Sequence, residues 1–186
     1  MKVFCLSIAW MGMGIVTYPL FVPLNGMSFG LSGGMIGLIL CLPSLASIAF
    51  VPLINAYVNK MGIELVICCS GLFFGLAFVI MGFTALVTTS TAYLWISIIT
   101  SIITGVAIAG NIVGEQALLL RYSTKEEREK NLGLFRAASG LGGLLAPLFG
   151  SAMYAWGGYM AAFMSVGAVY WLITPIIYFR LYAARD

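Results

Sequence analysis

The sequence predicts an all-α integral membrane protein, in which residues 1–186 form a single bundle of six transmembrane helices. Composition is the first reason: 62% of the 186 residues are hydrophobic and only 8% are charged, whereas soluble domains are about half apolar and about a quarter charged. The second reason is that six stretches each offer the roughly 20 apolar residues that a helix needs to cross a bilayer. We therefore expect the lipid bilayer to surround the chain.

Short segments that favour turns separate the expected spans. The uncharged segments "NGMSFGLSGG", "VTTSTA" and "WGGY" follow the first, third and fifth spans, and "NKMG" lies between the second and third. The apolar run behind Lys2 is longer than the core of a signal peptide and lacks a clear cleavage site, which predicts a retained helix. The six spans are roughly 3–24, 33–58, 63–87, 93–120, 132–155 and 159–179.

The positions of the basic residues predict the orientation of the bundle. With six spans, one side receives all nine lysines and arginines and the other side receives none. Because lysine and arginine mark the cytoplasmic side, we expect both termini and the loop 121–131 to be cytoplasmic. A solvated turn between two helices explains most residues of that loop equally well. The nine basic residues are Lys2, Lys60, Arg121, Lys125, Arg128, Lys130, Arg136, Arg180 and Arg185.

Several classes of function are disfavoured by the residue types present. The chain has no histidine, which excludes a Ser-His hydrolase and histidine-ligated metal or haem chemistry, so we expect neither an enzyme nor a metal site or cofactor. The four cysteines lie in apolar runs, where a thiol behaves as a small hydrophobic group. The basic residues are too few and too scattered to follow a phosphate backbone, and no nucleic-acid partner is expected.

The fourth span carries a line of polar residues on one face. Their spacings of four and three residues place them close to one line along a helix. Polar groups in a membrane turn toward the protein interior or toward a water-filled cavity, so this face is predicted to line a cavity. Hydrogen bonding between packed helices is the alternative. The line consists of Ser97, Ser101, Thr104, Ile108, Asn111 and Glu115.

Glu115 is the acidic residue that lies well inside a span. A charged, unpaired carboxylate in hydrocarbon costs several kcal/mol, so such a residue is a functional candidate. Arg136, one turn into the fifth span, approaches from the same side of the membrane and is a plausible partner. A structural Glu115–Arg136 ion pair and a role toward a solute or proton are both consistent with the sequence.

The fifth span places small residues along one face, within "ASGLGGLLAPLFGS". Small residues allow two membrane helices to approach closely, and a proline leaves one backbone carbonyl without its helical partner. The residues concerned are Ser139, Gly140, Gly143, Ala146, Pro147 and Gly150.

Two short motifs resemble those of the major facilitator superfamily. Its members carry Gly-x-x-x-Asp-Arg/Lys-x-Gly, followed by basic residues, between helices two and three. The turn "NAYVNKMGIEL" matches it at Lys60 and Gly62, and Ile63 and Glu64 stand at the basic positions. Asn59 replaces the aspartate, which is similar to the vesicular amine and drug antiporter branch. The fifth-span segment "GLLAPLFG", with Gly143, Ala146, Pro147 and Gly150, is similar to the antiporter motif Gly-x-x-x-Gly-Pro-x-x-Gly. Ser101 and Thr104 stand where proton-coupled members have an arginine and a glutamine.

The resemblance implies the N-terminal six-helix half of a twelve-helix secondary transporter. It implies transport of a small organic solute, which could be a cation, by alternating access. It also implies a partner, either a second six-helix half or another membrane subunit. The alternative is a structural or regulatory membrane protein that keeps this fold without transport. In a transporter of this type, the conformational turn and gate would be formed by Asn59, Lys60, Gly62 and Arg136. The residues expected to line the solute cavity are Ser97, Ser101, Thr104, Asn111, Glu115, Trp10 and Tyr18.

Overall fold

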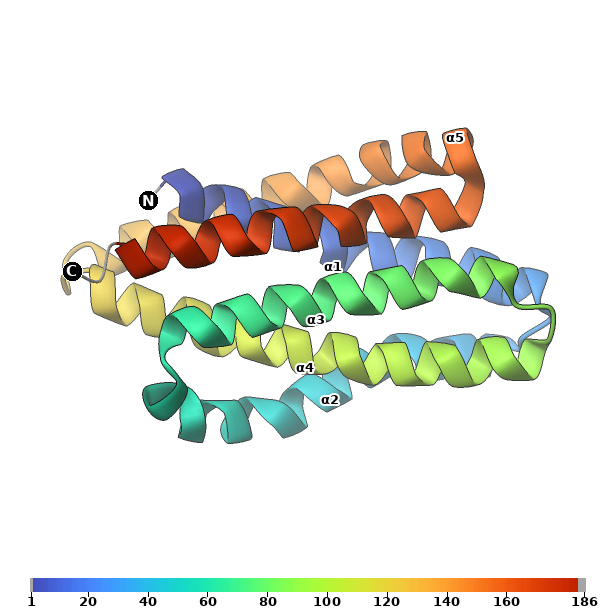
Figure 1. Cartoon of the computed structure of the whole chain (residues 1–186), viewed down its shortest axis with the longest axis horizontal. Coiled ribbons are helices and arrows are strands. Elements are labelled where there is room, and N and C mark those ends of the chain that lie inside the picture. Colours follow the sequence, from blue (N-terminus) through green and yellow to red (C-terminus); the bar gives the residue numbers. More distant parts are fainter. Residues whose placement is uncertain (1, 184–186) are drawn as a thin grey trace.

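The computed structural model describes the backbone of residues 2–183, and the side chains of residues 8–9 and 12–179. Every regular element in this part of the chain is helical, which agrees with the predicted fold class (Figure 1). The elements are α1 (Lys2–Ser28), α2 (Gly33–Met61), α3 (Ile63–Phe83), the short 3-10 helix η1 (Thr84–Leu86), α4 (Ser90–Tyr122) and α5 (Arg128–Ala183).

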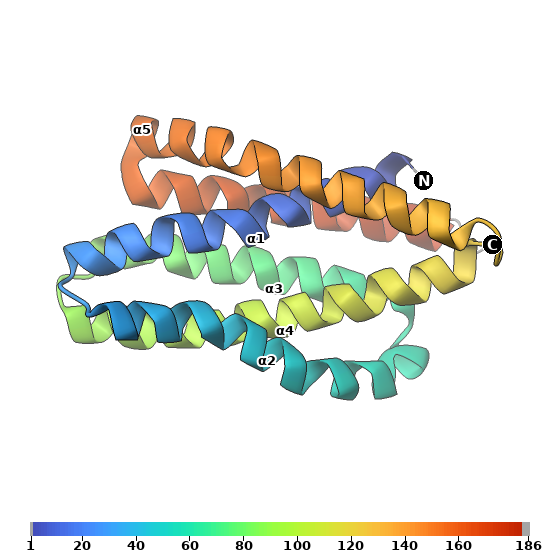
Figure 2. The same cartoon turned by 180° about the vertical axis from the view of Figure 1, so that it is seen from behind.

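α5 occupies the region where the sequence predicts two spans, 132–155 and 159–179. The described residues therefore form five α-helices instead of the expected six. α5 nevertheless contains a sharp break at Gly157 and Gly158, whose backbone angles are not helical, so it consists of two helices joined at these glycines. Gly158 has a φ of 69°, which favours glycine because other residues meet a steric penalty there. Figures 1 and 2 show the chain reversing at this break, so that α5 has two antiparallel arms.

The charged loop is shorter than predicted. The sequence analysis assigns residues 121–131 to a loop, but α4 continues to Tyr122 and α5 begins at Arg128. Ser123 adopts an extended conformation that ends α4, and its hydroxyl oxygen accepts a hydrogen bond of 2.7 Å from the Asn131 side-chain amide. This link between the two helix ends leaves only residues 123–127 outside the helices.

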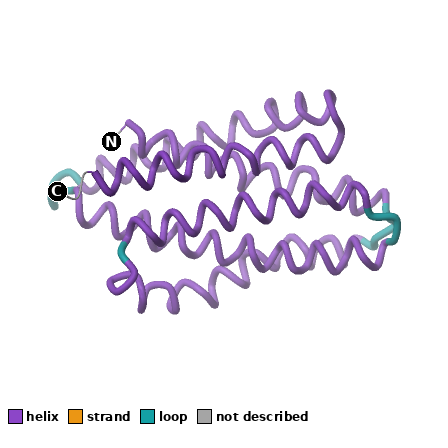
Figure 3. The backbone as a smooth tube through the Cα atoms, in the orientation of Figure 1, coloured by secondary structure: helices purple, strands orange, loops and turns teal. Residues whose placement is uncertain are grey.

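The connections fall at two opposite ends of the bundle. The α2–α3 turn, the α4–α5 loop and both chain ends lie at one end in Figures 1 and 2, and Figure 3 shows how short the connecting loops are. The α1–α2 and α3–α4 connections and the break in α5 lie at the other end. Five basic residues lie in the turn and loop of the first end or in the helix ends beside them, and we call this end the basic end: Lys60, Arg121, Lys125, Arg128 and Lys130.

The helices pack in a fixed set of neighbours. α1 lies mainly against α5, α2 lies against α4, and α3 contacts both α4 and α5. Aromatic side chains fill the centre: the rings of Phe78 and Phe163 are 5.4 Å apart, and those of Phe74 and Tyr170 are 5.2 Å apart. The prolines inside α2 remove backbone donors, and the second half of this helix diverges from α4 (Figure 2).

The outer surface of the bundle is apolar. Large hydrophobic side chains point outward along several helices; Ile48 on α2 is 72% exposed and Leu148 on α5 is 69% exposed. Among the described residues, four helical stretches are long and apolar enough to cross a membrane: Gly33–Met61, Ile63–Leu86, Ser90–Tyr122 and Arg128–Phe179. A surface of this kind suits a lipid environment, as the composition predicts.

Candidate functional site

The first part of the predicted polar line on α4 takes part in helix packing. The Ser101 hydroxyl donates a hydrogen bond of 3.0 Å to the Ile39 carbonyl of α2, and its oxygen lies 2.7 Å from the Tyr18 hydroxyl of α1. Ser97 is fully buried, and its oxygen lies 4.0 Å from the sulfur of Met81 on α3. These two serines therefore tie α4 to its neighbours, which is the arrangement expected of interhelical hydrogen bonds.

The middle of the polar line faces a small cavity of about 210 Å³ between α1, α2 and α4. Thr104 and Ile108 line it from α4, and Tyr18 lines it from α1. The Thr104 hydroxyl donates to the Thr100 carbonyl one turn earlier, at 2.8 Å, so its methyl group and oxygen are both held in place. Trp10, the second aromatic residue expected at the cavity, has a side chain outside the described residues.

The last part of the line faces a larger cavity near the basic end. The Asn111 side-chain amide donates a hydrogen bond of 2.9 Å to the Glu115 carboxylate, four residues further along α4. Glu115 lines a cavity of about 310 Å³ enclosed by α1, α4 and α5. Asn111 is buried, and its hydrogen bond orients the carboxylate. The cavity is lined by Ile8, Ile112, Glu115, Gln116, Leu119, Leu132, Phe135, Arg136 and Ser139.

Arg136 lines the same cavity as Glu115 but forms no direct ion pair with it. The one ion pair within the described part of the chain joins Arg121 to Glu64, at 2.9 Å. The separation of Glu115 from Arg136 follows from the packing: α4 lies against α2 and α3, whereas the arm of α5 that carries Arg136 lies against α1. The structural ion pair considered for these two residues is thus absent from the structure.

The turn between α2 and α3 is fixed by Gly62 and by Glu64. Gly62 has a φ of 88° and its N–H donates to the Val58 carbonyl at 2.9 Å, which ends α2 and lets α3 begin at the next residue. Lys60 is exposed, and its ammonium group lies 5.7 Å from the centre of the Tyr57 ring. Asn59 is exposed beside it.

Glu64 and Arg121 form a contact that the sequence analysis did not predict. Glu64, in the first turn of α3, is only 6% exposed, and Arg121, in the last turn of α4, retains 38% side-chain exposure. The available signal was that Glu64 occupies a position that is basic in the motif. A reversed charge there calls for a basic partner, and Arg121 at the same end of the bundle supplies it.

The small-residue face of α5 packs against α1. Ala146 and Gly150 are buried, and a Cβ added to Gly150 would lie 2.6 Å from the Phe21 ring. Gly143 is close to Val16, because an added Cβ would lie 3.3 Å from its side chain. Pro147 is exposed on another side of the helix. α1 therefore covers this face at Gly143 and Gly150, whereas Gly140 is exposed.

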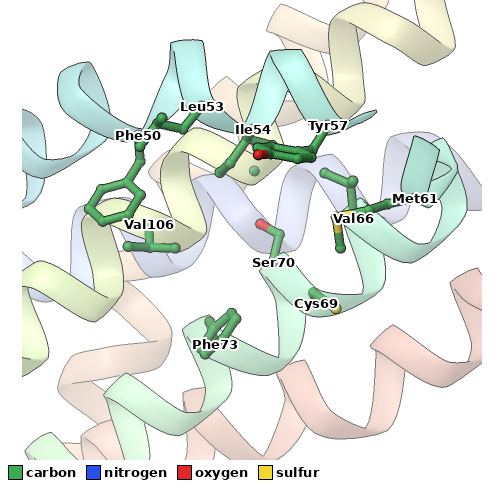
Figure 4. A pocket seen from close by; sticks show the side chains of 11 residues that line it. Phe50, Leu53, Ile54, Tyr57, Met61, Val66, Cys69, Ser70, Phe73 and Val106 are labelled. Carbon is green, nitrogen blue, oxygen red and sulfur yellow. The ribbon is translucent and has the colours of Figure 1, made fainter. Parts of the chain in front are cut away.

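A third cavity, of about 360 Å³, lies between the divergent half of α2, α3 and α4. Figure 4 shows Phe50, Leu53 and Tyr57 of α2 on one side and Cys69 and Phe73 of α3 on the other. The Ser70 hydroxyl, which also lines it, already donates to the Ala107 carbonyl. The lining is otherwise apolar, so this cavity offers little to a charged solute, and no residue of the predicted site lies in it.

Comparison with protein families gives a match over nearly the whole chain. The sequence model of the Major Facilitator Superfamily matches residues 3–186. Members of this family are transporters. No curated protein matches the sequence.

Proposed function

Because this chain belongs to the Major Facilitator Superfamily, we propose that it is a secondary transporter, or the N-terminal half of one, that moves a small organic solute by alternating access. The observation that carries this proposal is the cavity of about 310 Å³ with Glu115 and Arg136 in its wall. Its volume lies at the lower end of the range typical of small-molecule sites, about 300–1,000 Å³. The Asn59 substitution supports an amine or drug antiporter type within the family.

A charged cavity is costly inside a membrane protein. Leaving a carboxylate and a guanidinium in an apolar bundle costs several kcal/mol unless they bind a partner or water. The cavity surrounds these charges with apolar side chains such as Ile8 and Phe135, and a single amide hydrogen bond from Asn111 holds the Glu115 carboxylate. A ligand that binds there repays this cost. We therefore assign Glu115 to solute binding near the basic end.

The arrangement in the membrane follows from the two ends of the bundle. We propose six membrane passes, with α5 crossing twice, and a cytoplasmic position for the basic end and both termini. α1 has 27 residues and is about 40 Å long at 1.5 Å per residue, which exceeds the roughly 30 Å hydrocarbon thickness. Glu115 then lies near the cytoplasmic entrance.

A deeper position for the solute is the smaller cavity at Thr104 and Tyr18. Thr104 is eleven residues before Glu115 on the same helix, which corresponds to about 16 Å toward the membrane centre. Tyr18 offers an aromatic face for a cationic group, and Trp10 is a further candidate on the same helix. The turn at Asn59, Lys60 and Gly62, held by the Glu64–Arg121 ion pair, would fix the cytoplasmic ends of α2, α3 and α4 during the conformational change.

We also propose that the bundle acts with a partner. In transporters built from repeated halves, the solute site lies at the interface between the halves. The cavities at Glu115 and Thr104 are lined here by only three helices each. A second six-helix half, a second copy or another membrane subunit would close them.

Solute uptake into liposomes tests the proposal. The protein is purified together with any membrane partner that accompanies it, the preparation is reconstituted, and uptake is measured for radiolabelled choline, tetraethylammonium, glycine betaine, succinate and glucose. We expect saturable uptake of at least one solute, reduced at least tenfold by Glu115→Gln. Glu126→Gln, which neutralises an exposed carboxylate in the α4–α5 loop, is the matched control and should change nothing.

The same experiment distinguishes transport from a second candidate function. The packed positions of Ser97 and Ser101 and the loss of the motif aspartate at Asn59 favour a structural or regulatory membrane protein that no longer transports. A folded preparation that contains both the chain and its co-purifying membrane partner, and that still takes up no solute, supports this second function and contradicts the first.

A further inference from the structure

We propose that the solute is a zwitterion, with an ammonium group bound by Glu115 and a carboxylate bound by Arg136. This inference rests on the proposed function, because it names the solute class of the same cavity. Its starting point is that two opposite charges line one cavity from different helices without forming an ion pair with each other.

The surroundings of the two charges leave both of them available. α1 contributes Ile8 to the cavity, and the remaining lining residues of α4 and α5 are apolar apart from Gln116 and Ser139. No other charged side chain lines the cavity among the described residues. Glu115 accepts one hydrogen bond, from Asn111, but a carboxylate has about four acceptor positions. It can therefore still accept hydrogen bonds from an ammonium group.

Arg136 suits the acidic end of such a solute. A guanidinium group presents five N–H donors in a planar fork that matches a carboxylate with two parallel hydrogen bonds. The Arg136 side chain is exposed and lines the cavity, so its donors are accessible to a solute. Gln116, which directly follows Glu115, and Ser139, about one turn after Arg136, add neutral hydrogen-bonding groups on the same two helices.

Solutes with a single charge fit this cavity less well. A simple cation would bind Glu115 but would be repelled by the positive charge of Arg136, and a simple anion would bind Arg136 but would be repelled by the negative charge of Glu115. Like charges in one site and unpaired polar groups are the usual sources of such discrimination. A neutral solute would leave both charges without a partner. The zwitterion is the class that satisfies both.

Matched ligands test this inference directly. The probes are 4-aminobutanoate, its two one-charge analogues n-butylamine and n-butanoate, and neutral 1-butanol, together with zwitterions that have two to six carbons. Binding is measured as the rise in unfolding temperature of the purified full chain in mild detergent, over a series of probe concentrations. We expect at least one zwitterion to bind about tenfold or more tightly than its one-charge analogues.

Two variants assign the ends of the ligand. Arg136→Gln should reduce the affinity for the best zwitterion to that for the matching amine, and should leave amine binding unchanged or improved. Glu115→Gln should reduce it to the affinity for the matching carboxylate. Arg136→Lys should restore part of the zwitterion preference because it restores the charge. Lys125→Gln, in the exposed loop, is the control and should change no affinity.

The outcomes separate this inference from the proposed function. If an amine binds as tightly as the zwitterion and Arg136→Gln has no effect, the solute is a cation, and the zwitterion assignment is wrong although transport stands. If no zwitterion of the series binds better than its analogues while liposomes take up a neutral or singly charged solute, the result is the same. If no probe binds and no solute is taken up, both proposals fail.

Discussion

Replacing Gly142 with alanine should destabilise the bundle, because this residue is the point of closest approach between α1 and α5. A Cβ at Gly142 would overlap the carbonyl oxygen of Ala9, and it would lie 2.5 Å from the carbonyl carbon and 3.0 Å from the Cα of that residue. Non-bonded carbon atoms normally lie about 3.5–4.0 Å apart, so the two helices must separate by roughly 1 Å. Backbone atoms are involved on both sides, so no side-chain rotation can relieve the overlap.

The expected cost is about 1–3 kcal/mol, the usual range for inserting a methyl group into a packed interior. Gly140→Ala is the matched control: it lies on the same helix, two residues earlier, and an added Cβ there has no neighbour within 4 Å. That change should be neutral or stabilise α5 by up to about 1 kcal/mol, because alanine favours helix more than glycine does. Unfolding of both variants in detergent is followed by far-UV circular dichroism. Equal stability of the two variants would refute the proposed helix contact.

Three further predictions concern topology, the ion pair and the polar line on α4. In a background without the native cysteines, intact cells exposed to an impermeant thiol reagent should label a cysteine at Thr89 and not one at Lys125; the opposite pattern would invert the orientation. Arg121→Gln should destabilise the protein by about 1–3 kcal/mol because it leaves the buried Glu64 carboxylate unpaired. Lys125→Gln should have almost no effect on stability. Equal unfolding curves for the two variants would show that the ion pair contributes nothing. A cysteine at Gln116, in the wall of the charged cavity, should react with a small water-soluble thiosulfonate, and one at the packed Ser97 should not; equal rates would contradict the cavity.

The fold is predictable from the sequence to a large extent, because a membrane leaves few choices. Backbone groups in hydrocarbon must be hydrogen-bonded within their own segment, so long apolar stretches become helices. Turn-rich segments such as "VTTSTA" separate the helices where expected, and the break at Gly157 and Gly158 falls inside "WGGY". The misjudged part is the charged loop. Charge alone does not end a helix, and the hydrogen bond between Asn131 and Ser123 that shortens this loop joins residues that no local pattern connects.

The candidate site is less predictable, because spacing along one helix does not say which neighbour covers it. The spacing predicts one polar face on α4, whereas in the structure Ser101 donates to the Ile39 carbonyl of α2 and Glu115 lines a cavity. The same limit explains α5, where small residues indicate a close contact without naming the partner helix. In the structure α1 fills that role, at Ala9 and Phe21.

The two pairs of opposite charge near the basic end illustrate what separates a structural contact from a binding site. Glu64 and Arg121 lie at adjoining ends of α3 and α4, helices that pack together, so their charges meet at 2.9 Å and satisfy each other. Glu115 and Arg136 stand on helices with different neighbours, and the cavity between α1, α4 and α5 separates them. The first pair has little electrostatic capacity left for a ligand. The charges of the second pair attract each other only across the cavity and keep capacity for a ligand, and a bound molecule with complementary charges offsets the cost of burying Glu115. Removing either charge of the second pair should therefore cost binding more than stability, and removing Arg121 should do the opposite.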